Sequence, residues 1–163
     1  SGEDLWSPTL ADLDTVYVPI GMGSGICAMI ATRDALNLKT KVVGVVSTGA
    51  PSYALSFEKG EAVSTNAALT MADGVACRVP DLDALAIILK GAERIVQVTD
   101  GQIMAAMRHY YTDTHNVAEG AGAAPLAALL SERDAMAAKR VGVVLTGSGV
   151  DADVYQKVLA GQG

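Results

Sequence analysis

Two glycine-rich segments carry the residue types that this sequence offers for binding chemistry. Residues 21–25 follow an apolar run at 14–20, and residues 146–149, Thr-Gly-Ser-Gly, follow an apolar run at 140–145. Glycine lets backbone amides approach an anion closely, and a helix that begins at such a loop points its positive end at the anion. The first segment therefore predicts a phosphate site formed by Gly21, Met22, Gly23, Ser24 and Gly25. The alternative is a tight strand-to-helix corner without a ligand.

Alternating strands and helices are predicted to position these two loops. Apolar and β-branched runs predict strands at 14–20, 41–46, 94–99 and 140–145, and helical spacing predicts helices at 26–36, 51–59, 82–89, 100–114, 119–137 and 151–159. We expect Asp100 to cap the fourth of these helices, with Ile103, Met104, Met107 and Tyr111 on one face. The order favours an α/β fold, a mostly parallel twisted sheet with helices on both faces. Ligands of such sheets bind beyond the carboxyl ends of the strands.

Composition excludes several classes of function. Hydrophobic residues make up 50% of the 163 residues and charged residues 18%, which is typical of a folded domain. The net charge is -6 and no cluster of Lys and Arg occurs, so neither a nucleic-acid partner nor a membrane partner is expected. No apolar run reaches about 18 residues and no signal-peptide pattern opens the chain, which favours a soluble cytoplasmic protein. Cys27 and Cys77 lie in apolar runs, as small buried residues of a reducing compartment do.

A nicotinamide-dinucleotide site is the first alternative for the glycine loop. Gly23, Gly25 and Ala28 fit the pattern G-x-G-x-x-A after a strand. Such a site needs an acidic residue at the end of the second strand to bind the ribose, and positions 46–48 hold Val, Ser and Thr. The missing acid disfavours this alternative.

Four motifs in register resemble a known family. Val18-Pro-Ile-Gly-Met-Gly-Ser-Gly-Ile26 resembles the V-P-x-G-G-G-G phosphate loop of threonine dehydratases and serine racemases. Thr70-Met-Ala-Asp-Gly74 resembles T-I-A-D-G, Val117-Ala-Glu-Gly-Ala-Gly122 resembles V-x-E-x-(A/T)-(A/G)-G, and Val144-Leu-Thr-Gly-Ser-Gly-Val-Asp151 resembles V-L-S-G-G-N-x-D. On these motifs the chain resembles the fold-type II (tryptophan synthase beta-like) enzymes that use pyridoxal 5'-phosphate (PLP). Residues 11–163 then form one PLP-phosphate-binding α/β domain, and residues 1–10 are a junction.

The resemblance implies roles for individual residues. Residues 21–25 would bind the cofactor phosphate through backbone amides, and Thr146 stands where the family has a serine that bonds the pyridine nitrogen. Glu119 matches a family glutamate close to the cofactor, although an acid at a helix N-terminus is an equal alternative. We expect Asp73 to cap a turn. The family usually forms homodimers, which the resemblance carries over by analogy alone.

The family's catalytic lysine has no counterpart here. Relatives carry it in an S-F-K-x-R-G motif well before the glycine loop, where it forms a Schiff base with PLP. Lys59 stands in Ser56-Phe-Glu-Lys-Gly60, which falls after the second strand, and we expect it to face solvent. The chain is therefore predicted to hold no catalytic residue and to partner an N-terminal portion of the same enzyme. Some relatives bind Mg²⁺ or Ca²⁺ after the second strand, but Val46 and Ser52 occupy those positions, so no metal is expected.

The implied activity is that of a PLP-dependent lyase. A dehydratase or ammonia-lyase of this type removes the β-hydroxyl of threonine, serine or 3-hydroxyaspartate and yields a keto acid and ammonia. Three alternatives stay open: an amino-acid racemase on the same scaffold, the dinucleotide-binding domain, and a non-catalytic module that keeps only the phosphate site. His109 and His115 lie six residues apart, which suits surface or helix-end roles better than metal binding.

Overall fold

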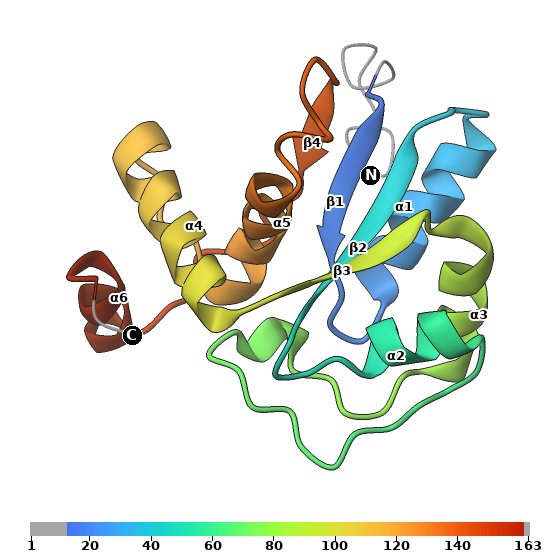
Figure 1. Cartoon of the computed structure of the whole chain (residues 1–163), viewed down its shortest axis with the longest axis horizontal. Helices are drawn as coiled ribbons and strands as arrows, with labels where there is room; N and C mark the ends of the chain where they lie inside the picture. Colours follow the sequence, from blue (N-terminus) through green and yellow to red (C-terminus); the bar gives the residue numbers. More distant parts are fainter. Residues whose placement is uncertain (1–12, 162–163) are drawn as a thin grey trace.

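A single parallel sheet forms the centre of the computed structural model, which describes residues 13–161. Its strands lie in the order β3-β2-β1-β4, with the bounds β1 (Thr15–Pro19), β2 (Lys41–Ser47), β3 (Arg94–Val98) and β4 (Val141–Val143) (Figure 1). Thr15 pairs with Lys41 on one side and with Val141 on the other, and Val43 pairs with Arg94. The parallel α/β class predicted from the sequence is confirmed.

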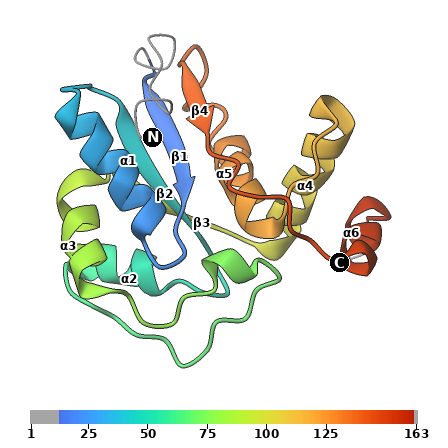
Figure 2. The same cartoon turned by 180° about the vertical axis from the view of Figure 1, so that it is seen from behind.

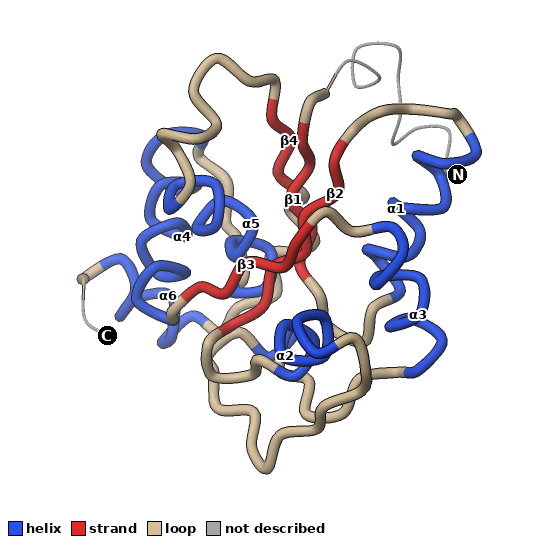
Figure 3. Tube along the Cα trace, turned by 45° about the vertical axis from the view of Figure 1, so that its right-hand side comes forward, coloured by secondary structure: helices blue, strands red, loops and turns tan. Residues whose placement is uncertain are grey.

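Helices cover both faces of this sheet. They are α1 (Ser24–Ala35), α2 (Ser52–Lys59), α3 (Leu82–Gly91), α4 (Asp100–Thr114), α5 (Gly120–Ser131) and α6 (Ala152–Leu159), with a 3-10 turn η2 (Asp73–Val75). Helices α1 and α3 lie on one side, whereas α5 packs on the other side between the sheet and α4, with α6 beyond (Figures 1 and 2). The segment between α2 and α3 is mostly loop (Figure 3).

Two hydrophobic cores result, one on each face. Alternate residues of β1 point to opposite sides, so Val16 and Val18 join one core and Tyr17 the other. The first core contains the buried residues of α1 and α3, including Ile26, Ile30, Leu85 and Ile88. The second consists mainly of the alanines of α5 with Ile103 and Met107 of α4. The low aromatic content is thus matched by an aliphatic, alanine-rich interior.

The start of α4 differs from the prediction. Thr99, not Asp100, is the N-cap: its hydroxyl accepts a hydrogen bond from the amide of Gln102, and the Gln102 side chain accepts one from the amide of Thr99. This reciprocal pair is a capping box, which satisfies two otherwise free donors. On the predicted face Ile103 and Met107 are buried, whereas Tyr111 at its end is 46% exposed and the neighbouring Tyr110 is buried.

Two further predicted bounds were too long. Helix α5 ends at Ser131 rather than near residue 137, and β4 covers three residues rather than six. Glu132, the residue after the helix, contacts Tyr17 and Arg94 with its side chain, and residues 132–138 form turns instead of continuing the helix. Within residues 13–161, none of the helices combines the length and the apolar character needed to cross a bilayer.

Candidate cofactor-binding site

The first glycine loop ends in the exposed N-terminus of α1. Gly23 is the N-cap, with φ 101°, a conformation that side chains with a Cβ rarely adopt. The helix begins with a hydrogen bond from the amide of Cys27 to the carbonyl of Gly23, at 3.0 Å. The amides of residues 24–26 therefore lie ahead of the helical ladder, and no side chain of the described chain caps them. Such amides, together with the helix dipole, form an anion site.

The three glycines of this loop differ in what surrounds the position of a Cβ atom. A Cβ at Gly21 would collide with the carbonyl oxygen of Gly74, and one at Gly23 would come within 2.6 Å of the Ala84 Cβ. A Cβ at Gly25, by contrast, would meet nothing within 4 Å. Gly21 and Gly23 are thus required by packing, whereas Gly25 faces open space at the helix N-terminus. That open space is what a bound phosphate requires.

Tyr53 of α2 binds this loop through its hydroxyl group. Its buried hydroxyl donates to the carbonyl of Met22 at 2.8 Å and accepts from the amide of Asp81 at 3.1 Å. Burial raises the pKa of the Tyr53 phenol, so the group stays neutral and keeps its proton for Met22. One side chain thereby connects the glycine loop to the start of α3. This role could not be predicted from the sequence, because Tyr53 falls in a short helix with no motif.

The second glycine loop is bound to Glu119, the N-cap of α5. The amide of Gly149 donates to Oε2 of Glu119 at 3.2 Å, and the amide of Glu119 donates to the carbonyl of Gly147 at 3.1 Å. A Cβ at Gly147 would lie 2.6 Å from Oε1 of Glu119. The Glu119 side chain makes no capping bond to its own helix. Glu119 thus lies at a helix N-terminus, as one of the two alternatives expected, and its side chain also binds the loop that carries the exposed Thr146.

The two loops lie at the same end of the sheet, beyond the carboxyl ends of β1 and β4. Strands β1 and β4 are parallel neighbours, so the segments after them emerge side by side. Tight packing of small residues continues between the loops, since Gly21 abuts Gly74, Gly74 abuts Ala121, and Gly122 abuts Gly147. The four motifs that the sequence placed in register therefore form one contiguous surface.

A cavity of about 250 Å³ lies in this surface, beside the second loop. Its lining includes Asp73, Gly74, Glu119 and Asp151, but none of residues 21–25. The structure thus places Thr146 and the first loop outside this cavity. Asp73 begins the η2 turn, but its side chain makes no capping hydrogen bond there, so the expected turn-cap role is wrong. Its exposed carboxylate faces the same cavity as Glu119 instead.

Asp100, predicted as a helix cap, fixes the loop that leads into this site. Its carboxylate accepts hydrogen bonds from the hydroxyl of Thr70 at 2.5 Å, the hydroxyl of Ser47 at 3.3 Å and the amide of Met71 at 2.9 Å. These bonds join the carboxyl end of β2, the start of α4 and the Thr70 motif. Asp100 is thus a supporting residue for the site, and only its position after a strand could have suggested it.

Several other predicted placements can be checked directly. Lys59 is exposed and pairs with Glu61 at 2.6 Å, as expected of a solvent-facing residue. Cys77 is buried, whereas Cys27 is only partly so, and both are free thiols. His109 pairs with Asp113 on the surface. Val46 and Ser52 are buried, and the described residues contain no group of three or more His, Cys, Asp or Glu side chains arranged to hold a metal.

Comparison with known proteins places this chain in a family. The model of the family described as "Pyridoxal-phosphate dependent enzyme" matches residues 2–147. The chain is 30% identical over 150 residues to the L-threonine ammonia-lyase of Thermotoga maritima, covering 92% of this chain and 37% of that protein. It is 33% identical over 141 residues to the beta-hydroxyaspartate dehydratase of Paracoccus denitrificans, covering 86% and 44% respectively.

A solved structure shows the same fold. The processed form of threonine deaminase isoform 2 from Solanum lycopersicum superimposes with a TM-score of 0.89 at 26% identity, over 98% of this chain and 44% of that one. The chain therefore spans less than half the length of these three proteins. The family match covers most of the chain and includes the glycine loop and the segment up to Gly147. The chain belongs to the family of pyridoxal-phosphate dependent enzymes.

Proposed function

We propose that this chain is the cofactor-holding part of a PLP-dependent dehydratase, or ammonia-lyase, of a β-hydroxy amino acid. The observation that carries the proposal is the open N-terminus of α1, where Gly25 faces free space while Gly21 and Gly23 are packed against the protein. An uncapped helix start with three available amides fits the phosphate of PLP. In this proposal the amides of residues 21–25 bind that phosphate, and the exposed hydroxyl of Ser24 adds a donor.

Thr146 and Glu119 take the second part of the site. When bound, PLP withdraws electrons from the α-carbon of an amino acid and so makes its proton and its β-substituent labile. The neutral hydroxyl of Thr146 would donate a hydrogen bond to the ring nitrogen, and Glu119 holds the Thr146 loop through Gly149. A neutral partner leaves the ring a weaker electron acceptor than an aspartate would. This favours prompt loss of a β-hydroxyl over a long-lived carbanion.

The relatives indicate the class of substrate. By their names, the Thermotoga protein acts on L-threonine and the Paracoccus protein on beta-hydroxyaspartate. Both named compounds carry a hydroxyl on the β-carbon. We therefore propose threonine, serine or 3-hydroxyaspartate as substrate, with a keto acid and ammonia as products. Cytoplasmic location and a homodimer accompany the proposal as predictions.

The experiment is an assay of the full-length gene product. We expect an absorbance band at roughly 410 nm after incubation with PLP, and release of a keto acid from at least one of L-threonine, L-serine and 3-hydroxyaspartate. Replacement of Gly25 by Asp introduces a carboxylate where the phosphate would lie, and its normal backbone angle and open surroundings allow the chain to fold. This variant should lose the band and the activity together.

Two controls make the assay decisive. Gly60→Asp carries the same change to a second glycine with open surroundings, at the end of α2. It should retain both the band and the activity, with at most a small loss of stability from its φ of 76°. A protein that shows no band with excess PLP, or a G25D variant that works like the parent, would overturn the proposal. Racemisation without keto-acid release would replace the lyase by a racemase.

A further inference from the structure

We infer that the amino ends of the strands form a second anion site, for a small phosphorylated or dicarboxylate metabolite. A cavity of about 380 Å³ lies there, and it is lined by Leu13, Asp14, Thr15, Lys39, Thr40, Lys41, Arg94, Met136 and Lys139. Its volume is within the range of small-molecule sites. Because Thr15, Lys41 and Arg94 each begin a strand, this cavity lies at the opposite end of the parallel sheet from the glycine loops.

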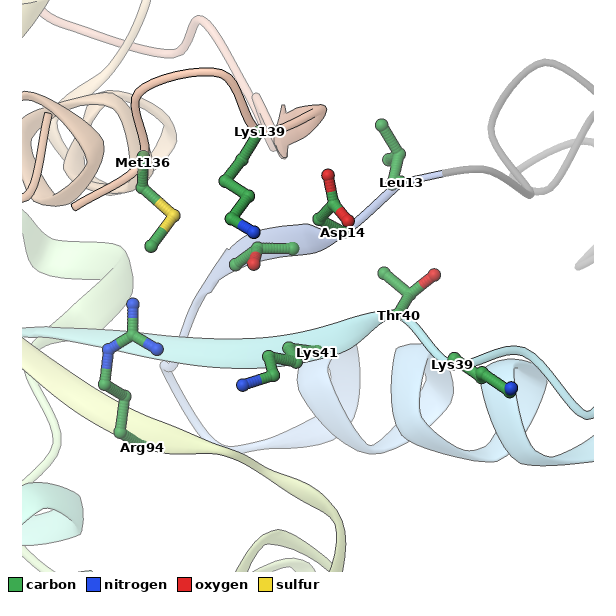
Figure 4. Close-up of a pocket in the computed structure, with 9 residues that line it drawn as sticks. Leu13, Asp14, Lys39, Thr40, Lys41, Arg94, Met136 and Lys139 are labelled. Atoms are coloured by element: carbon green, nitrogen blue, oxygen red, sulfur yellow. The ribbon is translucent and has the colours of Figure 1, made fainter. Parts of the chain in front are cut away.

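Charge is the first argument. The lining carries four cationic side chains and one acidic side chain, Asp14, in a chain whose net charge is -6. Figure 4 shows Lys139 reaching down toward β1, while Lys41 extends along β2 toward Arg94. Positive charge concentrated in a hollow of an acidic protein focuses the field that attracts an anion.

Pairing leaves two of these cations available. Lys41 pairs with Glu93 at 2.7 Å, and Arg94 is held by Glu132 and by the Tyr17 hydroxyl. Lys39 and Lys139, by contrast, form no ion pair and no side-chain hydrogen bond with any part of the described chain. Two unpaired ammonium groups on the walls of one cavity match the charge of a dianion such as a phosphate monoester or a dicarboxylate.

The second, independent argument is the hydroxyl of Thr40. Thr40 is only 2% exposed, it lines the cavity, and its Oγ1 is buried with no hydrogen-bond partner in the described structure. A buried hydroxyl without a partner costs free energy, and such groups are rare in folded proteins. In Figure 4 the side chain projects from the start of β2 into the space below Leu13 and Asp14. A bound anion would supply the missing acceptor once a small shift of the segment before β2 exposes this atom, which is fully covered in the described structure.

Asp14 sets the limit on what can bind. Its Oδ2 already accepts a hydrogen bond from the amide of Arg140 at 2.8 Å, which draws the carboxylate toward β4. Asp14 is the one acidic side chain of the lining, so it is the group of the cavity that would repel an anion. This site uses none of residues 21–25, so it stands whether or not the glycine loop binds PLP.

The test is anion binding by the 163-residue chain carrying Gly25→Asp, which blocks the glycine loop. Inorganic phosphate and succinate are titrated separately by isothermal titration calorimetry, to tell a phosphoryl ligand from a dicarboxylate. We expect saturable binding of at least one of them. The pair of substitutions K39Q and K139Q should weaken that binding at least about tenfold. The matched pair K59Q and K157Q removes two exposed lysines elsewhere and should change it less than about twofold.

Thr40→Val gives a readout that a purely structural role would not give. In the absence of anion, this isosteric change removes an unsatisfied polar atom and should raise the midpoint of thermal unfolding. It should also weaken anion binding by at least about threefold. No saturable binding of either anion, equal losses in the two lysine pairs, or a T40V variant that is less stable and binds normally would each overturn the inference.

Discussion

Replacing Gly23 with Ala should destabilise the protein through two separable effects. The φ of Gly23 is 101°, which residues with a Cβ rarely adopt, and the new Cβ would lie 2.6 Å from the Ala84 Cβ and 3.0 Å from the Tyr53 hydroxyl. The same substitution at Gly25 meets neither obstacle, because its Cβ would contact nothing within 4 Å. The pair G23A and G25A therefore compares the same change in chemistry at two positions of one loop.

The expected magnitudes follow from these geometries. The strained backbone costs about 1–3 kcal/mol, and overpacking against Ala84 and Tyr53 adds about 1–3 kcal/mol. G23A should thus lower the free energy of unfolding by about 2–5 kcal/mol. G25A should leave it unchanged or raise it by up to about 1 kcal/mol, because alanine reduces the entropy of the unfolded chain.

Urea unfolding followed by far-UV circular dichroism measures both variants. A second substitution, Ala84→Gly, removes the atom that the new Cβ strikes, so the double variant G23A/A84G should regain at least about 1 kcal/mol relative to the sum of the single changes. The cycle subtracts the loss of about 1 kcal/mol that glycine causes in α3. G23A within about 0.5 kcal/mol of the parent, or a cycle with no coupling, would refute this account of the loop.

Two other substitutions test the supports of the site and of the core. Tyr53→Phe removes the hydroxyl that joins Met22 to Asp81, and should cost about 1–3 kcal/mol of unfolding free energy while weakening phosphate binding; unchanged affinity would contradict the role of Tyr53. Glu132→Gln should weaken the dependence of the unfolding free energy on pH in the acidic range. Hydrogen bonding to Arg94 holds the pKa of Glu132 below its ordinary value, so this stabilisation is complete above about pH 5 and is lost as the pH falls through about 4 and below. If urea unfolding from pH 3 to 7 gave the same pH dependence for the parent and for E132Q, this role of Glu132 would be contradicted.

The sequence predicted those features that depend on local pattern. The β-branched run at 41–46 indicated a buried parallel strand, and the glycines at 21–25 indicated a loop at a helix start, because both signals come from neighbours in the chain. Gly60 ends α2 in the left-handed conformation and Asp81 caps α3, which agrees with the helix bounds predicted at 51–59 and 82–89. These elements were enough to place the two glycine loops at one edge of the sheet.

What the sequence did not predict depends on contacts between distant residues. Glu132, just after the end of α5, accepts a hydrogen bond from Tyr17, which lies 115 positions away in the sequence. Burial raises the pKa of Tyr17 to about 12, and the hydrogen bond to Glu132 and the charge of that residue raise it as well. The phenol therefore stays protonated and donates to the carboxylate. Asp100 likewise serves Thr70 rather than its own helix. The spacing of residues along the chain does not predict such contacts, because the partners come together only in the packed fold.

Binding of pyridoxamine 5'-phosphate to this chain tests the central claim most directly. That compound carries the phosphate but no aldehyde, so its affinity reports the glycine loop without any requirement for a lysine. The account predicts that it binds at least about tenfold more tightly than pyridoxamine, and that Gly25→Asp abolishes this difference while the circular dichroism spectrum stays unchanged. Equal affinity for the two compounds, or a G25D variant that still distinguishes them, would contradict it.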